Sequence, residues 1–362
     1  MVVGTRPELI KVAPLYTLFK AERLEPILVL TNQQQSMVTE LLPWFGIDDA
    51  VSLKAPTEDS LAGKFWQICK ELTKFFEEKA ESEWVFAQGD TTTVAASAIT
   101  TFYSGKKFAH VEAGLRCDTP WLPYPEEGNR RIVSEIAHLN FCPTQSAADN
   151  LSKSGTSLPN TVLVGNTGID ALLNSASKLQ ESPIQKHFQT TDTTKKILIT
   201  LHRRESFGEP MREACAAIRH IATKCDVEIL WPVHSNPSVS DVIRREFSDF
   251  PNVKLVSPLD YPQMVSAMTQ CDFILTDSGG IQEEAPALGK PVLVLRNETE
   301  RMELIEAGGG ILVGTAFDSI VNNATRLISD QEFFDSMILD FSPFGRGDSS
   351  RKIFDFYIHH QH

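Results

Sequence analysis

The sequence lacks the patterns that mark several common protein classes. Its six cysteines are scattered, with no Cys-x-x-Cys pair, which is typical of reduced thiols in a cytoplasmic protein. No apolar run approaches the roughly 18–20 residues needed to span a bilayer. The first residues also lack the charged-then-apolar layout of a signal peptide. We therefore expect a cytoplasmic protein that does not insert into a membrane.

Signatures of common cofactor sites are also missing. The chain has no GxGxxG after its first strand, no Walker sequence and no clustered Cys/His ligands, so neither a dinucleotide site nor a metal site of the usual kind is expected. The formal net charge of −13 argues against a general nucleic-acid or anionic-membrane surface. An acidic chain can still bind a nucleotide, because local amides and arginines decide that.

Short apolar strand candidates alternate with helical stretches along the whole chain of 362 residues. The candidates are Met1–Val3, Pro26–Leu30, Trp84–Ala87, Lys107–Val111, Asn140–Cys142, Val162–Val164, Lys196–Leu201, Glu228–Pro232, Val253–Val256, Phe273–Thr276, Val292–Leu295 and Ile311–Val313. Such a βαβα order predicts an α/β fold with parallel sheets and helices on both faces.

The length and the pattern predict two Rossmann-like domains. We expect the first over residues 1–170, with a C-terminal helix at 346–362 packing back on it, and the second over 171–345. The polar stretch 182–195 is the best linker candidate. Because ligands of open α/β sheets bind at the carboxyl ends of the strands, a deep cleft between the domains is the expected ligand site.

The segment CDFILTDSGGIQEEAPALGKP, residues 271–291, runs from a strand through Ser278-Gly279-Gly280 into a helix. Amides at such a helix start stabilise a phosphate without a charged side chain. The alternative is a tight turn whose glycines only let helix and strand pack.

Two turns in the first half carry charged residues directly after a strand. GTRPELIK places Arg6 and Lys11 where both could reach one anion. QGDTTT places Asp90 just after the candidate strand Trp84–Ala87. The alternatives are solvated charges for the first turn and a helix cap for Asp90.

Further candidates follow the same layout. Glu112 in HVEAGLR comes directly after a strand, and Glu126 in YPEEGNRR opens a helix. An isolated glutamate at the first position is usually structural, and acids in a first helical turn often only complement the helix dipole. His202 in LHRRESFG and His234 in WPVHSNP stand at strand tips, where each donates to a phosphate, shuttles a proton or makes a structural hydrogen bond.

Together these segments resemble the signatures of the non-hydrolysing UDP-N-acetylglucosamine 2-epimerases. The matching stretches are GTRPELIK, QGDTTT, HVEAGLR, YPEEGNRR, VGNTGIDAL, LHRRESFG, WPVHSNP and TDSGGIQEEAPALGKPVLVLRNETER. They occur in the family's order from residue 4 to residue 301. The resemblance implies a GT-B-like fold, a homodimer, and no cofactor or metal. It implies reversible conversion of UDP-GlcNAc to UDP-ManNAc by anti elimination of UDP to 2-acetamidoglucal and re-addition.

The resemblance also implies roles for individual residues. As acid/base carboxylates and a catalytic histidine it implies Asp90, Glu112, Glu126 and His202. As contacts to the UDP moiety it implies Arg6, Lys11, Ser278, Gly279, Gly280, Glu284 and Arg301. In this assignment Glu284 holds the ribose and Glu283 is mainly structural. Residues placed to support these are Arg116, Arg203 and His234.

Some positions depart from the family pattern. Gln34 stands where members usually carry a histidine, and the loop 55–61 lacks their usual glutamine. In bacterial members these segments contribute to a second, regulatory UDP-GlcNAc site, so its presence here is left open. The departures also favour a related sugar, such as a 2,3-diacetamido uronate or a deoxy sugar. A hydrolysing 2-epimerase, which would have the same fold and acids, and a GT-B glycosyltransferase, which would have a nucleotide site in its second domain, are the further alternatives.

Overall fold

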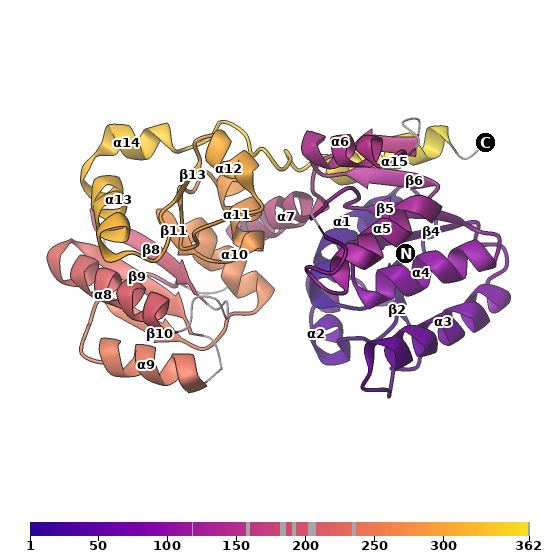
Figure 1. The fold of residues 1–362 in the computed structure, drawn as a ribbon, viewed down its shortest axis with the longest axis horizontal. Coiled ribbons are helices and arrows are strands. Elements are labelled where there is room, and N and C mark those ends of the chain that lie inside the picture. Colours follow the sequence, from indigo (N-terminus) through magenta and orange to yellow (C-terminus); the bar gives the residue numbers. More distant parts are fainter. Residues whose placement is uncertain are drawn as a thin grey trace. The chain divides into compact units, whose positions relative to one another are not determined.

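The computed structural model describes residues 1–117, 119–156, 160–181, 186–189, 193–201, 208–233 and 237–360. The chain forms two compact units. The first comprises Met1–Ala171 together with Phe344–His362, and the second comprises Leu172–Pro343. Each unit is built on one parallel sheet with helices, so the α/β fold expected from the strand pattern is confirmed (Figure 1).

The first unit has a seven-stranded sheet in the order β3-β2-β1-β4-β5-β6-β7. Its strands are β1 (Val2–Val3), β2 (Val29–Leu30), β3 (Val51–Ser52), β4 (Trp84–Gln88), β5 (Lys107–Val111), β6 (Leu139–Cys142) and β7 (Thr161–Leu163). All of these pairs are parallel. The order runs outward in both directions from β1 and β4, which makes the space between them the point where the winding reverses.

Several helices of the first unit are capped at their N-termini by the side chain that precedes them. The helices of this unit are α1 (Arg6–Ala21), α2 (Gln35–Thr39), α3 (Leu61–Glu78), α4 (Thr92–Tyr103), α5 (Glu126–Ile136), α6 (Gln145–Lys153) and α15 (Ser349–His359). Ser60 and Thr91 accept hydrogen bonds from the third amide of α3 and α4, which satisfies a donor that the helix itself leaves free. The helix α7 (Thr167–Glu181) crosses from the first unit into the second.

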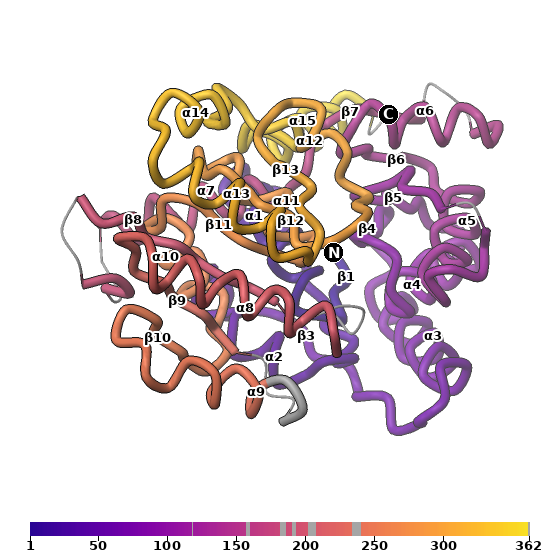
Figure 2. Tube along the Cα trace, turned by 60° about the vertical axis from the view of Figure 1, so that its left-hand side comes forward, coloured from indigo at the N-terminus to yellow at the C-terminus, as the bar shows by residue number. Residues whose placement is uncertain are grey.

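Two hydrophobic clusters cover opposite faces of this sheet because neighbouring residues of a strand point to opposite sides. Val85 of β4 packs with residues of α3 and α4, whereas Phe86 packs with residues of α1 and α15. Figures 1 and 2 both show α3 and α4 side by side. The last helix is fixed by Asp170, whose carboxylate accepts from the amides of Ser349 and Ser350 at 3.3 and 2.7 Å.

The second unit has a six-stranded parallel sheet in the order β10-β9-β8-β11-β12-β13. Its strands are β8 (Lys195–Thr200), β9 (Val227–Pro232), β10 (Val253–Val256), β11 (Phe273–Thr276), β12 (Val292–Val294) and β13 (Gly310–Leu312). Its helices are α8 (Glu209–Lys224), α9 (Pro237–Phe247), α10 (Tyr261–Gln270), α11 (Gly279–Glu284), α12 (Met302–Glu306), α13 (Phe317–Ser329) and α14 (Gln331–Ser336). The winding reverses between β8 and β11.

Every strand expected from the sequence is present. Lys107–Val111, Val253–Val256 and Phe273–Thr276 match at both ends, and the ends of the others differ by at most three residues. The strand β3 was not expected. It is two residues long and exposed, so it carries no apolar alternation for a sequence pattern to reveal. Within the described ranges, no helix has both the length and the apolar character needed to cross a membrane.

Candidate active site

The turns that follow β1 and β4 meet at the reversal point of the first sheet. Gly4 leads from β1 into α1, and a Cβ at this position would lie 2.0 Å from Oγ1 of Thr93, at the start of α4. Only glycine allows this close approach. Arg6 then opens α1, and Asp90 lies in the turn before α4. Ligands of open α/β sheets bind at such a point, so both residues are well placed.

Glu112 is held in an unusual backbone conformation directly after β5. Its φ is +66°, a left-handed value that costs free energy for most residues other than glycine and asparagine. Residues in such strained conformations are often found at functional sites. One oxygen, Oε2, lies 2.5 Å from the ammonium of Lys11 and accepts from Nε2 of Gln88 at 2.9 Å. The Glu112 side chain is 12% exposed.

Lys11 thus contacts a carboxylate rather than standing free for an anion. Its side chain leaves α1 and reaches Glu112 across 101 positions of sequence. The Arg6 side chain is half-buried, and its own amide donates to Oε1 of Gln34 at 3.3 Å. Whether Lys11 also contacts a nucleotide, as the resemblance implies, stays a prediction.

Asp90 does not cap the helix that follows it. The N-cap of α4 is Thr91, whose Oγ1 accepts from the amide of Val94 at 3.3 Å. The carboxylate of Asp90 instead lies 3.5 Å from Nε of Arg130 and remains 30% exposed. The structural alternative weighed for this residue, a simple helix cap, is therefore wrong.

The two glutamates at the start of α5 have different roles. Glu127 is fully buried, and it accepts from the amide of Cys117 at 3.1 Å and from Nε of Arg131 at 2.7 Å. It therefore fixes the loop between β5 and α5. Glu126 is half-buried, and its carboxylate has no hydrogen-bond or ion-pair partner among the described residues. Its carboxylate is the one of the pair that is available to a substrate.

A buried carboxylate not singled out from the sequence joins the two turns of the reversal point. Oε2 of Glu8 accepts from the amides of Gly4 and Thr5 at 2.5 and 2.8 Å. Its other oxygen, Oε1, accepts from the hydroxyl of Thr91. The residue is 1% exposed. Burial raises the pKa of Glu8 to about 7, although the hydrogen bonds from Thr91, Gly4 and Thr5 act in the opposite direction.

This raised pKa predicts a pH dependence of stability. The folded chain keeps the Glu8 proton up to about pH 7, whereas an ordinary glutamate releases it near 4.5. The unfolded chain therefore binds fewer protons between these values, and stability falls as the pH rises from one to the other, by up to roughly 3 kcal/mol. Below the lower value both states are protonated and the contribution is fully present.

Comparison with Glu8→Gln isolates this contribution, because glutamine does not ionise. The melting temperature of the variant should rise relative to the wild type when the buffer changes from about pH 5 to about pH 8. If the difference in melting temperature between the variant and the wild type does not change with pH, Glu8 does not titrate in this range.

The segment where Gln34 replaces the family's histidine is tied to the same turns. Oε1 of Gln33 accepts from Oγ1 of Thr93 at 2.9 Å, while the backbone amide of Gln34 donates to the carbonyl of Gly4 at 2.8 Å. Both glutamines therefore brace the reversal point from the side of β2. Whether a second nucleotide sugar binds here stays open.

Arg116 supports a loop rather than the Glu112 carboxylate. Its guanidinium donates to the carbonyl of Leu115 and to Oγ of Ser134, both at 2.8 Å. Burial lowers its pKa. It lines a cavity of about 560 Å³ with residues of α5 and α6.

The second unit repeats the arrangement at its own reversal point. Thr200 of β8 and Thr276 of β11 are joined through their hydroxyls at 2.6 Å. Ser278 then precedes α11, where Gly279 is buried and Gly280 is exposed. A Cβ on Gly279 would lie 3.1 Å from Cζ of Arg301. The glycine therefore lets a guanidinium pack against the start of the helix.

Arg301 is held beside this helix start by acids. Its Nε donates to Oε1 of Glu283 at 2.9 Å, and its Nη1 to Oε2 of Glu300 at 3.3 Å. Burial would raise the pKa of Glu300, but hydrogen bonds and charge from Arg296, with a smaller effect of Arg301, lower it to about 2. Glu283 thus positions the arginine, in agreement with the structural role expected for it.

Glu284 lies on the next position of α11 and is half-buried. Burial and then the charge of Glu284 raise the pKa of the Tyr261 hydroxyl, against a hydrogen bond with Ser175. His202, Arg203 and His234 lie outside the described residues.

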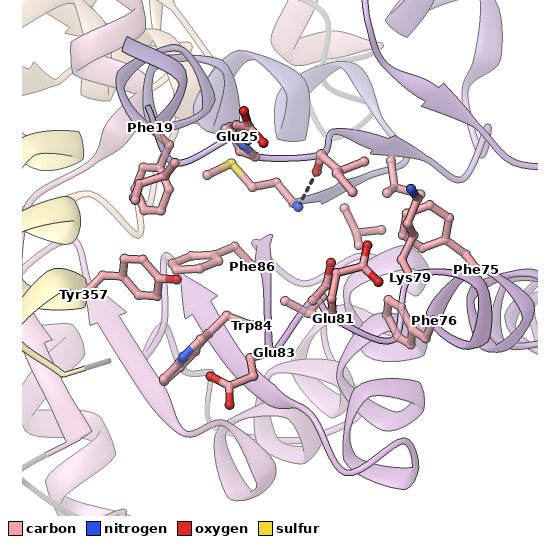
Figure 3. A pocket seen from close by; sticks show the side chains of 18 residues that line it. Phe19, Glu25, Phe75, Phe76, Lys79, Glu81, Glu83, Trp84, Phe86 and Tyr357 are labelled. Carbon is pink, nitrogen blue, oxygen red and sulfur yellow. Dashed lines mark hydrogen bonds between the residues drawn. The ribbon is translucent and has the colours of Figure 1, made fainter. Parts of the chain in front are cut away.

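The cavity of about 680 Å³ in Figure 3 is a different place. Its lining includes Met1, Ile27 and Trp84, from the amino-terminal side of β1, β2 and β4. The amine of Met1 donates to the carbonyl of Ile27 at 2.7 Å. The predicted site residues follow the carboxyl ends of these strands. This cavity therefore lies at the opposite end of the sheet from the predicted site residues.

Comparison with known proteins decides the family. The model of the family described as UDP-N-acetylglucosamine 2-epimerase matches residues 17–357. The chain belongs to this family. The family resemblance read from the motifs is thereby confirmed, as is the prediction of an enzyme.

Relatives of this epimerase family match over almost the full chain. The UDP-N-acetylglucosamine 2-epimerase of Salmonella borreze is 39% identical over 368 residues, covering 99% of this chain and 97% of that one. The one of Bacillus subtilis is 39% identical over 362 residues, covering 99% and 94%. The crystal structure of UDP-GlcNAc 2-epimerase from Neisseria meningitidis bound to UDP-GlcNAc is 36% identical with a TM-score of 0.88, covering 99% and 98%.

In this epimerase family member the structure thus assembles two sets of predicted residues. The first set surrounds Glu112 and Asp90, and the second surrounds Ser278 and Arg301. Gln88, Arg130 and Glu8 lie within the matching motifs, but the sequence pattern gives none of them a role in the site. The contacts of Gln88 with Glu112, of Arg130 with Asp90 and of Glu8 with Thr91 join residues 24, 40 and 83 positions apart. No local sequence pattern therefore reveals these contacts. That one cleft joins both sets stays a prediction.

Proposed function

We propose that this protein interconverts UDP-N-acetylglucosamine and UDP-N-acetylmannosamine without net hydrolysis. A carboxylate takes the C2 proton while the electron pair of that bond forms the C1=C2 double bond and UDP leaves from C1. The intermediate is 2-acetamidoglucal. UDP then adds back at C1 as a proton is delivered to the opposite face of C2, so that no oxidant, reductant or water is consumed.

The proposal is supported most by Glu112 and its contacts. A proton acceptor must be ionised and fixed beside the reacting carbon. The ammonium of Lys11 at 2.5 Å and the amide of Gln88 at 2.9 Å stabilise the charged form of one oxygen and fix its position. Asp90 and Glu126 supply the further carboxyl groups that a proton transfer on the other face requires. The division of acid and base roles among the three stays open.

The second set suits the leaving group. Departure of UDP develops negative charge on its diphosphate, and preorganised cations and amides stabilise such charge. Arg301 carries the cation, and the first amides of α11 have no acceptor within the helix. The exposed Gly280 has no atom within 4 Å of an added Cβ, so this helix start is accessible. Glu284 is assigned to the ribose.

The test is NMR of UDP-GlcNAc incubated with the protein. We expect an equilibrium mixture with UDP-ManNAc and no accumulation of free UDP. Free N-acetylmannosamine would show a hydrolysing 2-epimerase, and transfer to an added sugar would show a glycosyltransferase. No change at C2 for any of a panel of UDP-N-acetylhexosamines would contradict the proposal, whereas turnover of only a diacetamido or deoxy sugar would redefine the substrate.

Arg301→Ala should weaken UDP binding about 10- to 100-fold, because it removes a charge-assisted contact to the diphosphate. Isothermal titration calorimetry with UDP measures the change. Arg326→Ala is the matched control, since this arginine of α13 is 58% exposed and pairs with Asp330, the residue that directly follows the helix. Equal UDP affinity of Arg301→Ala and the control would refute the assignment.

We also propose a cytoplasmic homodimer. The support is the resemblance together with six free cysteines, which suit a reducing compartment. Light scattering on the purified chain tests the oligomeric state, and a mass of about 40.3 kDa would show a monomer instead.

A further inference from the structure

Glu8 is the buried carboxylate that connects the turn before α1 with the turn before α4. Oε2 holds the amides of Gly4 and Thr5, and Oε1 holds the hydroxyl of Thr91. Its contacts therefore reach one turn 3 to 4 residues upstream and another 83 residues downstream. With 1% of its surface exposed, Glu8 does not contact a substrate itself.

In each of the two turns, a predicted site residue is adjacent in sequence to a residue that hydrogen-bonds to Glu8. Thr5 is followed directly by Arg6, and Thr91 is preceded directly by Asp90. The Asp90 backbone is anchored on its other side, since its carbonyl accepts from Nδ2 of Asn129 at 2.8 Å. A displacement of either end of the Glu8 network would therefore move Arg6 relative to Asp90.

The packing around the network leaves little room for another arrangement. Gly4 lies so close to α4 that even a methyl group would overlap Thr93. The hydroxyls of Thr31 and Thr93 bond to each other at 2.8 Å beside it. In such a close-packed region one missing link shifts its neighbours, and a misplacement of about 1 Å at a reacting group can lower a rate about 10²-fold.

We propose that Glu8 is a positioning residue for the epimerase reaction, which sets the distance between Arg6 and Asp90 by joining their turns. The inference rests on the proposed function. In this role the hydrogen bonds of the Glu8 side chain to the two turns are essential, and its negative charge is not.

Substitutions at Glu8 separate the links from the charge. In Glu8→Gln the amide oxygen accepts from Gly4 and Thr5, and the amide nitrogen donates to Oγ1 of Thr91, so both links persist without a charge. Glu8→Ala removes both. Thr91→Ser keeps the hydroxyl that contacts Glu8 and caps α4, whereas Thr91→Ala removes it.

Asp170→Ala provides the matched control for lost stability. Asp170 is likewise a buried carboxylate of the first unit that accepts from two amides, those of Ser349 and Ser350. Its partners belong to α15 and not to the turns that carry Arg6 and Asp90. A purely structural role of Glu8 would therefore give Glu8→Ala and Asp170→Ala the same phenotype.

The experiment measures kcat, KM and melting temperature for the wild type and these variants with UDP-GlcNAc. We expect Glu8→Ala and Thr91→Ala to lower kcat about 10- to 100-fold and to raise KM. Glu8→Gln and Thr91→Ser should stay within about threefold of the wild type, and Asp170→Ala should lose melting temperature but keep its kcat.

Three results would overturn the inference: wild-type kinetics of Glu8→Ala, equal loss of kcat in Asp170→Ala, or a loss in Glu8→Gln as large as in Glu8→Ala. If Glu8→Ala does not fold, the pair Thr91→Ala and Thr91→Ser decides, since equal kinetics of these two would overturn it as well. An inactive wild type would instead contradict the proposed function, so the two failures are distinguishable.

Discussion

Glu112→Gln is expected to lower kcat by about 10²- to 10⁴-fold and to leave UDP affinity within about threefold of the wild type. Glutamine matches glutamate in size, and its amide oxygen can still accept from Lys11 and Gln88. The change therefore removes the ability to take a proton while the contacts at 2.5 and 2.9 Å remain possible. A loss of rate without a loss of binding is the signature of a group needed only for chemistry.

Two measurements check this expectation. Stopped incubations followed by NMR give the rate of epimerisation, and the same samples in D₂O report exchange at C2. Glu77→Gln, an exposed residue of α3, is the control for a changed charge in the same unit. Epimerisation and C2 exchange at wild-type rates would remove Glu112 from the acid/base role, and lost UDP binding would assign it to the nucleotide.

Asp90→Asn is expected to lower kcat by a similar factor of about 10² to 10⁴ with little loss of stability. Because Thr91 and not Asp90 caps α4, the substitution leaves the helix start intact. Arg130 keeps Glu127, whose Oε2 is 3.3 Å from its Nε, so no buried charge is left alone. The small structural cost makes a large kinetic effect attributable to the carboxyl group itself.

The measurement pairs kcat with the melting temperature. Thr91→Ala serves as the comparison, because it removes the real cap and should lower stability by about 1 kcal/mol. A melting temperature of Asp90→Asn as low as that of Thr91→Ala, together with wild-type kcat per folded molecule, would show that Asp90 is structural after all.

Much of the fold was predictable because it follows from local rules. Apolar runs such as Lys107–Val111 became strands, and the alternation of strands and helices required parallel sheets. The start of α5 at Glu126 also agrees with the sequence pattern. The short, exposed strand β3 was missed because two residues carry no periodic signal.

The site was predictable only in part. Motifs placed Arg6, Asp90 and Glu112 after strands, because the carboxyl ends of parallel strands share one edge. They did not show that Lys11 lies against Glu112 or that Arg301 packs on Gly279. The left-handed φ of Glu112 was equally invisible, since a glutamate rarely adopts it and no neighbouring glycine signals it.

The sequence by itself determined the class of fold, the family and the strand ends that carry reactive groups, because these depend on periodicity and on short segments of fixed composition. Only the tertiary structure decided which charges meet, such as Lys11 with Glu112 and Arg130 with Asp90. The physical reason is that such pairs are formed by side chains on different elements, and their distances follow from the packing of helices on a sheet rather than from separation along the chain.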